Sequence, residues 1–307
     1  MRARDRGDLR RDQHGGRRAR AGDRPAPGGA GVTSRLGVVA GVAGLIVIAL
    51  AGAAAPWLAP TGPYTPDLGA RLGAPGGAHL LGQDTLGRDV LARVLYGTRI
   101  SLGVATAAVG LSLAAGTVLG CVAGYAGGWV DEALTRVIDV LLAFPGLLLA
   151  IALAAVRGPS LPNVVLALSV LGWTGYARLA RAAVMSLRER EFVAAARALG
   201  ARPVRIVARH LLPLAGPVLL VQATFGMAGA MVAEGSLSFL GVGAPPPLPS
   251  WGAMIDEGRP FLLVAPHLVV FPGLALALAV LALQLLGDGL RDLLDVRLDG
   301  AGRMTPS

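Results

Sequence analysis

The chain has 307 residues, of which 54% are hydrophobic and only 15% are charged, which is too apolar for a soluble domain of this length. Its net charge of +9 comes from arginine, because the sequence contains no lysine. The Gly-x-x-x-x-Gly-Lys loop that holds nucleotide phosphates is therefore excluded from these residues, and the chain is no P-loop ATPase by itself. Charges gather at the ends and in a few loops, a pattern typical of a polytopic membrane protein.

Residues 1–35 are rich in arginine, glycine and proline and show no apolar periodicity. This composition predicts a disordered tail, and its arginines favour the cytoplasmic side under the positive-inside rule. The alternative, a nucleic-acid-binding arm, is disfavoured because no aromatic residues alternate with the arginines.

Six apolar runs follow this tail. A helix needs about 20 residues to cross the hydrocarbon core, and the runs predict spans at 36–58, 100–123, 137–156, 163–180, 214–233 and 261–286. We expect Phe144 and Pro145 to kink the third span, and the small residues of the second to allow close packing. The predicted fold class is an all-α membrane protein with six transmembrane helices.

Three further segments lie outside these spans. Segment 59–99 is polar and is predicted to be extracytoplasmic, 239–260 is predicted to be a second outer loop, and 288–307 a cytoplasmic C-terminal tail. Within the first segment, apolar residues recur at helical spacing and predict an amphipathic helix at the outer interface. These residues are Leu86, Val90, Leu91, Val94 and Leu95.

A charged island, residues 188–213, separates the fourth and fifth spans. Strong helix formers predict a short helix over Glu191 to Leu199, and Gly200 should end it in the left-handed conformation. Pro203 suits the first turn of a second helix, which Pro213 should close. The apolar face predicted for that second helix consists of Val204, Val207, Ala208 and Leu211.

Several motifs resemble one family. Within the island, Ala-Ala-x-x-x-Gly is followed after nine residues by His-x-Leu-Pro. This resembles the cytoplasmic loop of ABC importer permeases, especially those for dipeptides, oligopeptides and nickel. The motif Leu-Gly-x-Asp-x-Leu-Gly-Arg-Asp at 81–89, loop 239–260 and the segment from Asp288 resemble the same family in order. Three positions depart from its pattern, where Ala194 replaces glutamate, His210 replaces isoleucine and Val296 replaces the usual proline.

The resemblance implies the type I ABC importer permease fold, with a core of five helices over 100–287 behind a peripheral first helix. It implies a homologous permease partner, two ATPase subunits and an extracytoplasmic substrate-binding protein. No cofactor is expected on this chain, since ATP and magnesium belong to the ATPase subunits. Transport of peptides, nickel or other small solutes by alternating access is the implied function, and the chain itself is expected to be no enzyme.

Candidate site residues fall into three groups, and none is assigned to catalysis or to a metal. Coupling to the ATPase is expected at Glu191, Ala195, Ala196, Arg197, Gly200, Arg205, His210, Leu212 and Pro213. The translocation path is expected at Gln222, Met227, Met231 and Glu234. The outer gate or receptor contact is expected at Asp84, Arg88, Asp89 and Trp251. For His210, a packing or capping role is favoured over a pH sensor.

Other classes of protein remain open. An ATP-independent channel or secondary transporter should carry paired ionisable residues inside the membrane, and only Glu234 and Asp139 are acids near span edges. A membrane-embedded hydrolase is weakened by the lack of a convergent catalytic set. Arginine placement predicts cytoplasmic N- and C-termini in a bacterial inner membrane, with the charged island on the same side.

Overall fold

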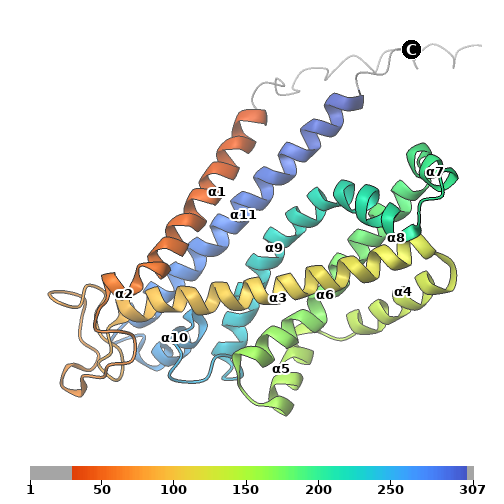
Figure 1. The fold of residues 1–307 in the computed structure, drawn as a ribbon. Helices are drawn as coiled ribbons and strands as arrows, with labels where there is room; N and C mark the ends of the chain where they lie inside the picture. Colours follow the sequence, from red (N-terminus) through yellow and green to blue (C-terminus); the bar gives the residue numbers. More distant parts are fainter. Residues whose placement is uncertain (1–29, 303–307) are drawn as a thin grey trace, which may run out of the picture.

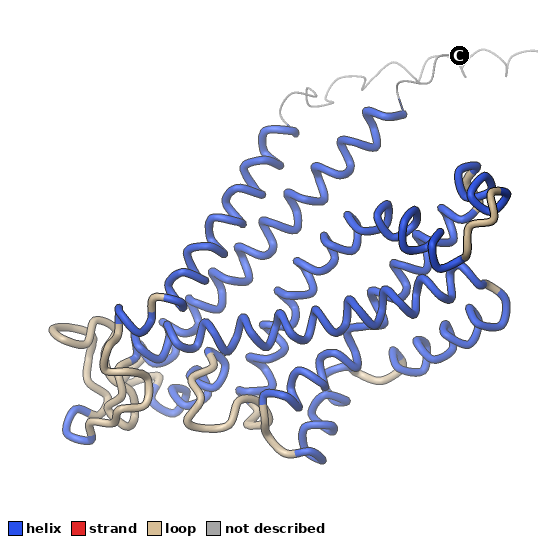
Figure 2. Tube along the Cα trace, in the orientation of Figure 1, coloured by secondary structure: helices blue, strands red, loops and turns tan. Residues whose placement is uncertain are grey.

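The computed structural model describes residues 30–302, and within them the fold is helical (Figures 1 and 2). The β pairing among these residues amounts to two isolated bridges, Gly76 with His79 and Gln83 with Asp89. The predicted all-α class is confirmed for this part of the chain. The helices are α1 (Ala30–Ala53), α2 (Ala55–Leu58), η1 (Leu68–Ala70), α3 (Val90–Ala126), α4 (Gly128–Leu142), α5 (Gly146–Arg157), α6 (Leu161–Arg188), α7 (Glu191–Ala198), α8 (Pro203–Ile206), η2 (Val207–Leu211), α9 (Leu212–Phe239), α10 (Trp251–Gly258), η3 (Arg259–Phe261) and α11 (His267–Gly302).

Four helical stretches are long and apolar enough to cross a membrane, namely Ser34–Ala53, Val90–Ala126, Pro203–Phe239 and His267–Leu294. The pair α4 and α5 makes a fifth if it is one broken span. Its two halves are bent by 82° at the break that holds Phe144 and Pro145, which confirms the predicted kink. Helix α6, at the predicted fourth span, has 28 residues but is not among the stretches that meet these criteria.

Neither outermost helix keeps its predicted bounds. Helix α1 begins at Ala30, so the predicted tail boundary at residue 35 is wrong, and it ends at Ala53, short of the predicted 58, where the short helix α2 follows. Helix α11 runs through the predicted tail to Gly302, because Val296 stands where a proline would interrupt the backbone ladder. The remainder of both predicted tails, 1–29 and 303–307, lies outside the described residues.

The predicted interfacial helix does not exist as a separate element. Leu86 lies in a loop, and Val90, Leu91, Val94 and Leu95 form the first turns of α3, which continues unbroken for 37 residues. The Asp89 side chain caps this helix by accepting from the Ala92 N–H at 2.8 Å. The sequence offers no break between the amphipathic stretch and the apolar run, so one helix serves both.

Small residues bring α3 and α6 together. A Cβ added at Gly116 or Gly120 would lie 2.4 or 2.3 Å from the carbonyl oxygen of Trp173 or Ala177, and one at Gly124 would meet the next turn of α6. Such close approach is how helices pack where water cannot drive association. Helices α1 and α11 pack side by side, and α9 lies between α11 and α6 (Figure 1).

The bundle has two unlike ends. We call the end with residues 59–89 and α10 the loop end, and the end with residues 188–213 the elbow end (Figure 2). Helix α10 falls inside the segment 239–260 that was predicted to be loop. The Ser250 hydroxyl caps α10 by accepting from the Ala253 N–H at 3.2 Å, a start signal that the proline-rich context obscured.

Candidate functional site

The charged island forms a helical elbow, residues 188–213, at one end of the bundle (Figure 1). Helix α7 begins at Glu191, as predicted, and ends at Ala198, one residue before the predicted Leu199. Gly200 has φ of +79°, the left-handed conformation that glycine adopts without steric cost. The first helix of the elbow and its glycine stop are therefore confirmed as local structure.

The second half of the elbow differs from the prediction. Helix α8 starts at Pro203 but passes through the π-helical turn η2 directly into α9, so it is no separate helix. Pro213 does not close the segment. It is the second residue of α9, in the first turn, where the N–H that proline lacks is not needed for a hydrogen bond within α9. Ile206 and Leu211, five residues apart as a π turn requires, are fully buried, whereas Val204 and Ala208 are exposed.

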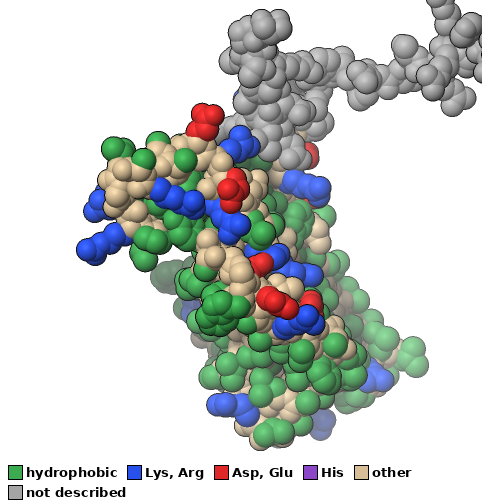
Figure 3. Space-filling model, turned by 90° about the vertical axis from the view of Figure 1, so that its right-hand side faces the viewer, with side chains coloured by type: hydrophobic (Ala, Val, Ile, Leu, Met, Phe, Trp, Pro, Cys, Tyr) green, Lys and Arg blue, Asp and Glu red, His purple; other side chains and the backbone are tan. Residues whose placement is uncertain are grey.

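The elbow has a buried base and an exposed apolar tip. Val193, Ile206 and Leu211 have no solvent exposure and belong to a core cluster with α3 and α6 side chains. By contrast, Leu199 is 88% exposed and Val204 is 79% exposed. Figure 3, a view toward this end, shows basic side chains gathered with a few acidic ones across the surface. An exposed apolar tip on a fixed base is suited to contact with another protein.

Arginines tie the elbow to α3. The Arg188 Nη1 donates to the Gly124 carbonyl at 2.9 Å and to the Tyr125 carbonyl at 3.4 Å. In addition, the Arg197 guanidinium lies over the Tyr125 ring. About two turns earlier, Arg181 of α6 forms a two-pronged ion pair with Asp131 of α4, in which the Nη2 to Oδ2 distance is 2.6 Å. These contacts hold the end of α6 against the α3–α4 turn.

The other predicted coupling residues surround this base. His210 is half-buried, and its Nδ1 has no hydrogen-bond partner within residues 30–302. The side chains on the outer surface of the elbow are Glu191, Ala195, Arg197, Gly200, Arg205 and Pro213, whereas Ala196 and Leu212 are half-buried.

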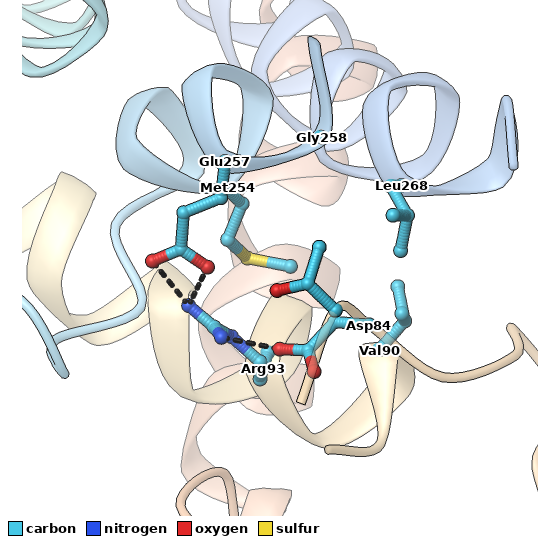
Figure 4. Close-up of a pocket in the computed structure, with 8 residues that line it drawn as sticks. Asp84, Val90, Arg93, Met254, Glu257, Gly258 and Leu268 are labelled. Atoms are coloured by element: carbon cyan, nitrogen blue, oxygen red, sulfur yellow. Dashed lines mark hydrogen bonds and ion pairs between the residues drawn. The ribbon is translucent and has the colours of Figure 1, made fainter. Parts of the chain in front are cut away.

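A buried ion cluster lies at the loop end (Figure 4). The Asp84 carboxylate accepts from Arg88 Nε at 2.6 Å and from Arg93 Nη1 at 2.5 Å. Both guanidiniums also donate to Glu257 on α10, Arg88 at 2.9 Å and Arg93 at 3.0 Å. Arg93 is 1% exposed, and Asp84 and Arg88 are almost as well buried. The cluster therefore fixes segment 59–89 to α3 and α10.

The carboxylates of this cluster differ in environment. Burial raises the pKa of Glu257, although the positive charge of Arg88 opposes that rise. Asp84 also accepts from the backbone N–H groups of Leu86 and Arg88, at 2.8 and 2.9 Å. Asp89 lies outside the cluster, where its Oδ2 is 2.7 Å from His79 Nδ1. The predicted outer-gate acids thus act here as a turn anchor and a helix cap.

Trp251 is the fourth predicted residue at the loop end, and it is 1% exposed. Its indole N–H donates to the Val94 carbonyl at 3.0 Å, and its backbone N–H donates to the Ser101 hydroxyl at 3.3 Å. Trp251 therefore locks α10 onto α3 and presents no surface to a receptor in this conformation. Arg93 and Glu257 were missed from the sequence, although an arginine on the apolar face of a helix was a usable signal.

The predicted path residues are not brought to one surface. Gln222 lines a cavity of about 380 Å³ between α3, α5, α6 and α9, whose walls carry Gly172, Gly226 and Tyr176. Met231 is fully buried in the core, and Met227 packs half-buried between two core clusters. Of these three residues, Gln222 alone faces the cavity.

Glu234 is fully buried at the loop end of α9. Its carboxylate accepts from the Ser238 hydroxyl at 2.7 Å and lies 3.5 Å from the Ser101 hydroxyl. Ser250 in turn contacts Ser238 at 3.4 Å. Glu234 and the three serine hydroxyls around it connect α9 to α3 and to the start of α10. The acid therefore has a structural role here. Among the described residues, no group of three His, Cys, Asp or Glu side chains is placed to hold a metal.

The sequence of this chain matches a known protein family and several known proteins. Residues 116–300 match the family described as binding-protein-dependent transport system inner membrane component. The chain belongs to this family. A dipeptide transport system permease protein of Alkalihalophilus pseudofirmus is 45% identical over 74% of this chain and 75% of its own length. A glutathione transport system permease protein of Pectobacterium atrosepticum is 46% identical over 73% of this chain and 74% of its own length.

The predicted membership in the ABC importer permeases is thereby confirmed, and the chain is a multi-pass membrane protein. The family match covers the elbow, α9 and α10 of this permease. The matched region begins after the loop-end segment 59–89. Asp84 and Arg88 of the buried ion cluster therefore lie outside it.

Proposed function

We propose that this permease forms half of the translocation path of an ATP-driven importer and that the elbow receives its motion from a separate ATPase subunit. The observation that carries the proposal is the combination of a fully buried elbow base with the exposed Leu199 and Val204. A base that is packed against α3 and α6 can transmit a displacement of the tip into the bundle, which a mobile loop would absorb.

The tip supports binding energetically. Complete burial of a leucine or valine side chain contributes about 1.5–3 kcal/mol. Burial of both residues in a groove of the ATPase would therefore stabilise the complex appreciably. Exposed arginines around the tip, including Arg205, supply charge complementarity for acidic groups on the partner. Nucleotide and magnesium would be bound by that partner, since the permease sequence holds no P-loop.

Arginine distribution supports an orientation. The elbow and the nearby end of α6 carry arginines at 178, 181, 188, 190, 197, 202, 205 and 209. Under the positive-inside rule this end faces the cytoplasm, together with both termini. The loop end would then face outward, where a substrate-binding protein delivers its cargo. A homologous permease would complete the path beside α9, and six membrane crossings, with α6 as one of them, satisfy this arrangement.

The proposed substrates are short peptides. The two relatives described above are named for dipeptide and glutathione transport, and glutathione is itself a tripeptide. We propose alternating access as the mechanism, with the cavity at Gln222 as part of the path. Nickel and other small solutes remain secondary candidates.

The test uses Leu199→Asp and Val204→Asp, which alter exposed side chains and should leave insertion intact. The matched control is Leu263→Asp at the loop end, because Leu263 is 98% exposed. We expect the two tip variants to lose ATPase co-purification and ATP-dependent peptide uptake in proteoliposomes, while the control retains the ATPase. Full retention of the ATPase by both tip variants would contradict the proposal.

The same assay separates the competing class. An ATP-independent channel or secondary transporter would move solute without nucleotide and would not depend on the elbow. Glu234, the acid that such a mechanism would use, is surrounded by the hydroxyls of Ser101 and Ser238. Uptake that persists without ATP and fails in Glu234→Gln would favour that class.

A further inference from the structure

A second groove lies on the α3–α6 face at the loop end, apart from the cavity that contains Gln222. It has a volume of about 700 Å³, within the range of small-molecule sites. Its apolar walls come from two helices, with Ile100, Gly103, Val104 and Leu111 on α3 and Leu161, Val165 and Leu166 on α6. Its polar lining is Arg99, Arg157 and Asn163.

The two arginines come from different helices: Arg99 lies nine residues after the start of α3, and Arg157 is the last residue of α5. Arg99 Nε and Nη2 donate to the Gly52 and Ala53 carbonyls at the end of α1, at 2.8 and 3.0 Å. Arg157 closes α5, and its Nε donates to Asn163 at 3.2 Å. Neither guanidinium is paired with a carboxylate within residues 30–302. Arg99 Nη1 and both Arg157 Nη atoms also lack a hydrogen-bond partner there.

We propose that this groove binds one anionic membrane phospholipid, with its phosphate on Arg99 and Arg157 and one acyl chain along the apolar walls. The length fits, because α3 rises about 17 Å from Ile100 to Leu111, close to the roughly 15 Å of hydrocarbon in one leaflet. Arginines at span ends extend toward the phosphate level, and their charge selects an anionic headgroup.

The walls distinguish a lipid from other occupants. Free inorganic phosphate would leave the apolar lining uncovered, whereas an acyl chain covers it. A partner helix would have to place acidic side chains opposite both guanidiniums at the membrane edge, where unpaired charge is costly. The groove is open at Gly103, since a Cβ there would meet no atom within 4 Å. A chain can therefore lie directly against the α3 backbone.

The test measures lipid retention by the purified full-length chain in detergent, using native mass spectrometry. The probes are phosphatidylglycerol, phosphatidylcholine with identical acyl chains, and inorganic phosphate. We expect one tightly held phosphatidylglycerol, with preference over phosphatidylcholine. Arg157→Gln should weaken phosphatidylglycerol about fivefold and phosphatidylcholine by less, because choline offsets the charge of its phosphate. Gly103→Leu should fill the groove and abolish retention of both lipids.

Matched controls keep the result specific. Arg136→Gln removes an exposed arginine at the other end of the bundle, and Gly273→Leu fills open space on α11. Both should retain lipid as the wild type does. Equal retention of the two lipids, unchanged retention by Gly103→Leu, or full competition by inorganic phosphate would overturn the proposal. So would cross-linking of Gly103→Cys to a partner permease in the assembled complex, because protein would then occupy the groove.

Discussion

The Arg197 guanidinium lies 5.2 Å from the centre of the Tyr125 ring, and its Nε donates to the Tyr125 hydroxyl at 3.4 Å. Arg197 belongs to the last turn of α7, and Tyr125 to the last turn of α3. The contact therefore connects the tip of the elbow to the longest helix that reaches the loop end. Displacement of α7 by a partner would be felt by α3 through this pair.

Loss of the pair should loosen α7 without unfolding the bundle. Arg197→Gln removes the cation and should cost about 0.5–1 kcal/mol of local stability, the usual strength of an exposed cation–π contact. Backbone amides of residues 191–198 should then exchange hydrogen faster. The control is Arg205→Gln, since Arg205 is exposed and makes no ion pair within residues 30–302. Equal exchange in the two variants would show that the pair does not restrain α7.

Gly200 should act through its backbone conformation alone. A Cβ at this position would meet no atom within 4 Å, so added bulk clashes with nothing. Its φ of +79° disfavours a β-branched residue by about 1–2 kcal/mol, whereas asparagine tolerates this region. Gly200→Val should therefore raise the ATP hydrolysed per peptide imported, and Gly200→Asn should stay near the wild type. Wild-type coupling in Gly200→Val would remove the glycine from the mechanism.

Removal of the charge on Asp84 should destabilise the protein more than removal of the charge on Glu257. Asp84→Asn leaves Arg88 and Arg93 buried with less countercharge, and breaking such a pair costs about 3–5 kcal/mol. Glu257 is only partly buried, with 28% of its side chain exposed, and burial raises its pKa, so the folded state gains little from the charged form and Glu257→Gln should change stability by about 1 kcal/mol or less. Thermal unfolding in detergent measures both. A larger loss in Glu257→Gln than in Asp84→Asn would contradict this order.

The pH dependence of stability should report on Glu257, because burial raises its pKa above the ordinary value of 4.5. Between 4.5 and the higher folded-state pKa, the folded protein holds a proton that the unfolded chain has released. The free energy of unfolding contributed by this group therefore increases as pH falls through that window and is smallest above it. The melting temperature of the wild type relative to Glu257→Gln should rise from neutral pH toward 4.5. A fall in that difference would give the wrong sign.

Much of this architecture follows from local sequence. Apolar runs locate the long helices, Phe144 and Pro145 produce the bend between α4 and α5, and Gly200 ends α7. Each of these features depends on residues close together in the chain. The family resemblance rested on the same kind of short motif, and the match over residues 116–300 confirms it.

What sequence reasoning missed depends on contacts between distant residues or on continuity. Glu257 meets Arg93 across 164 positions, which no local pattern encodes. The continuity of α8 with α9 was missed because the π turn η2 joins them. Its five-residue hydrogen-bond spacing does not match the period of 3.6 residues per turn that identifies an α-helix in a sequence. Met231 has the character of a path residue, yet packing placed it wholly inside the core.

The glycines of α3 should prove essential wherever they face α6. In Gly120→Leu the side chain would begin 2.3 Å from the Ala177 carbonyl oxygen, so the two helices must separate. We expect a loss of about 3 kcal/mol or more, since the obstacle is backbone and cannot rotate away. Gly110→Leu is the control on the same helix, because a Cβ there meets no atom within 4 Å. Unfolding of both variants by sodium dodecyl sulfate in mixed micelles, followed by tryptophan fluorescence, compares them directly. If Gly120→Leu unfolded at the same detergent fraction as Gly110→Leu, close backbone approach would not be what holds α3 to α6.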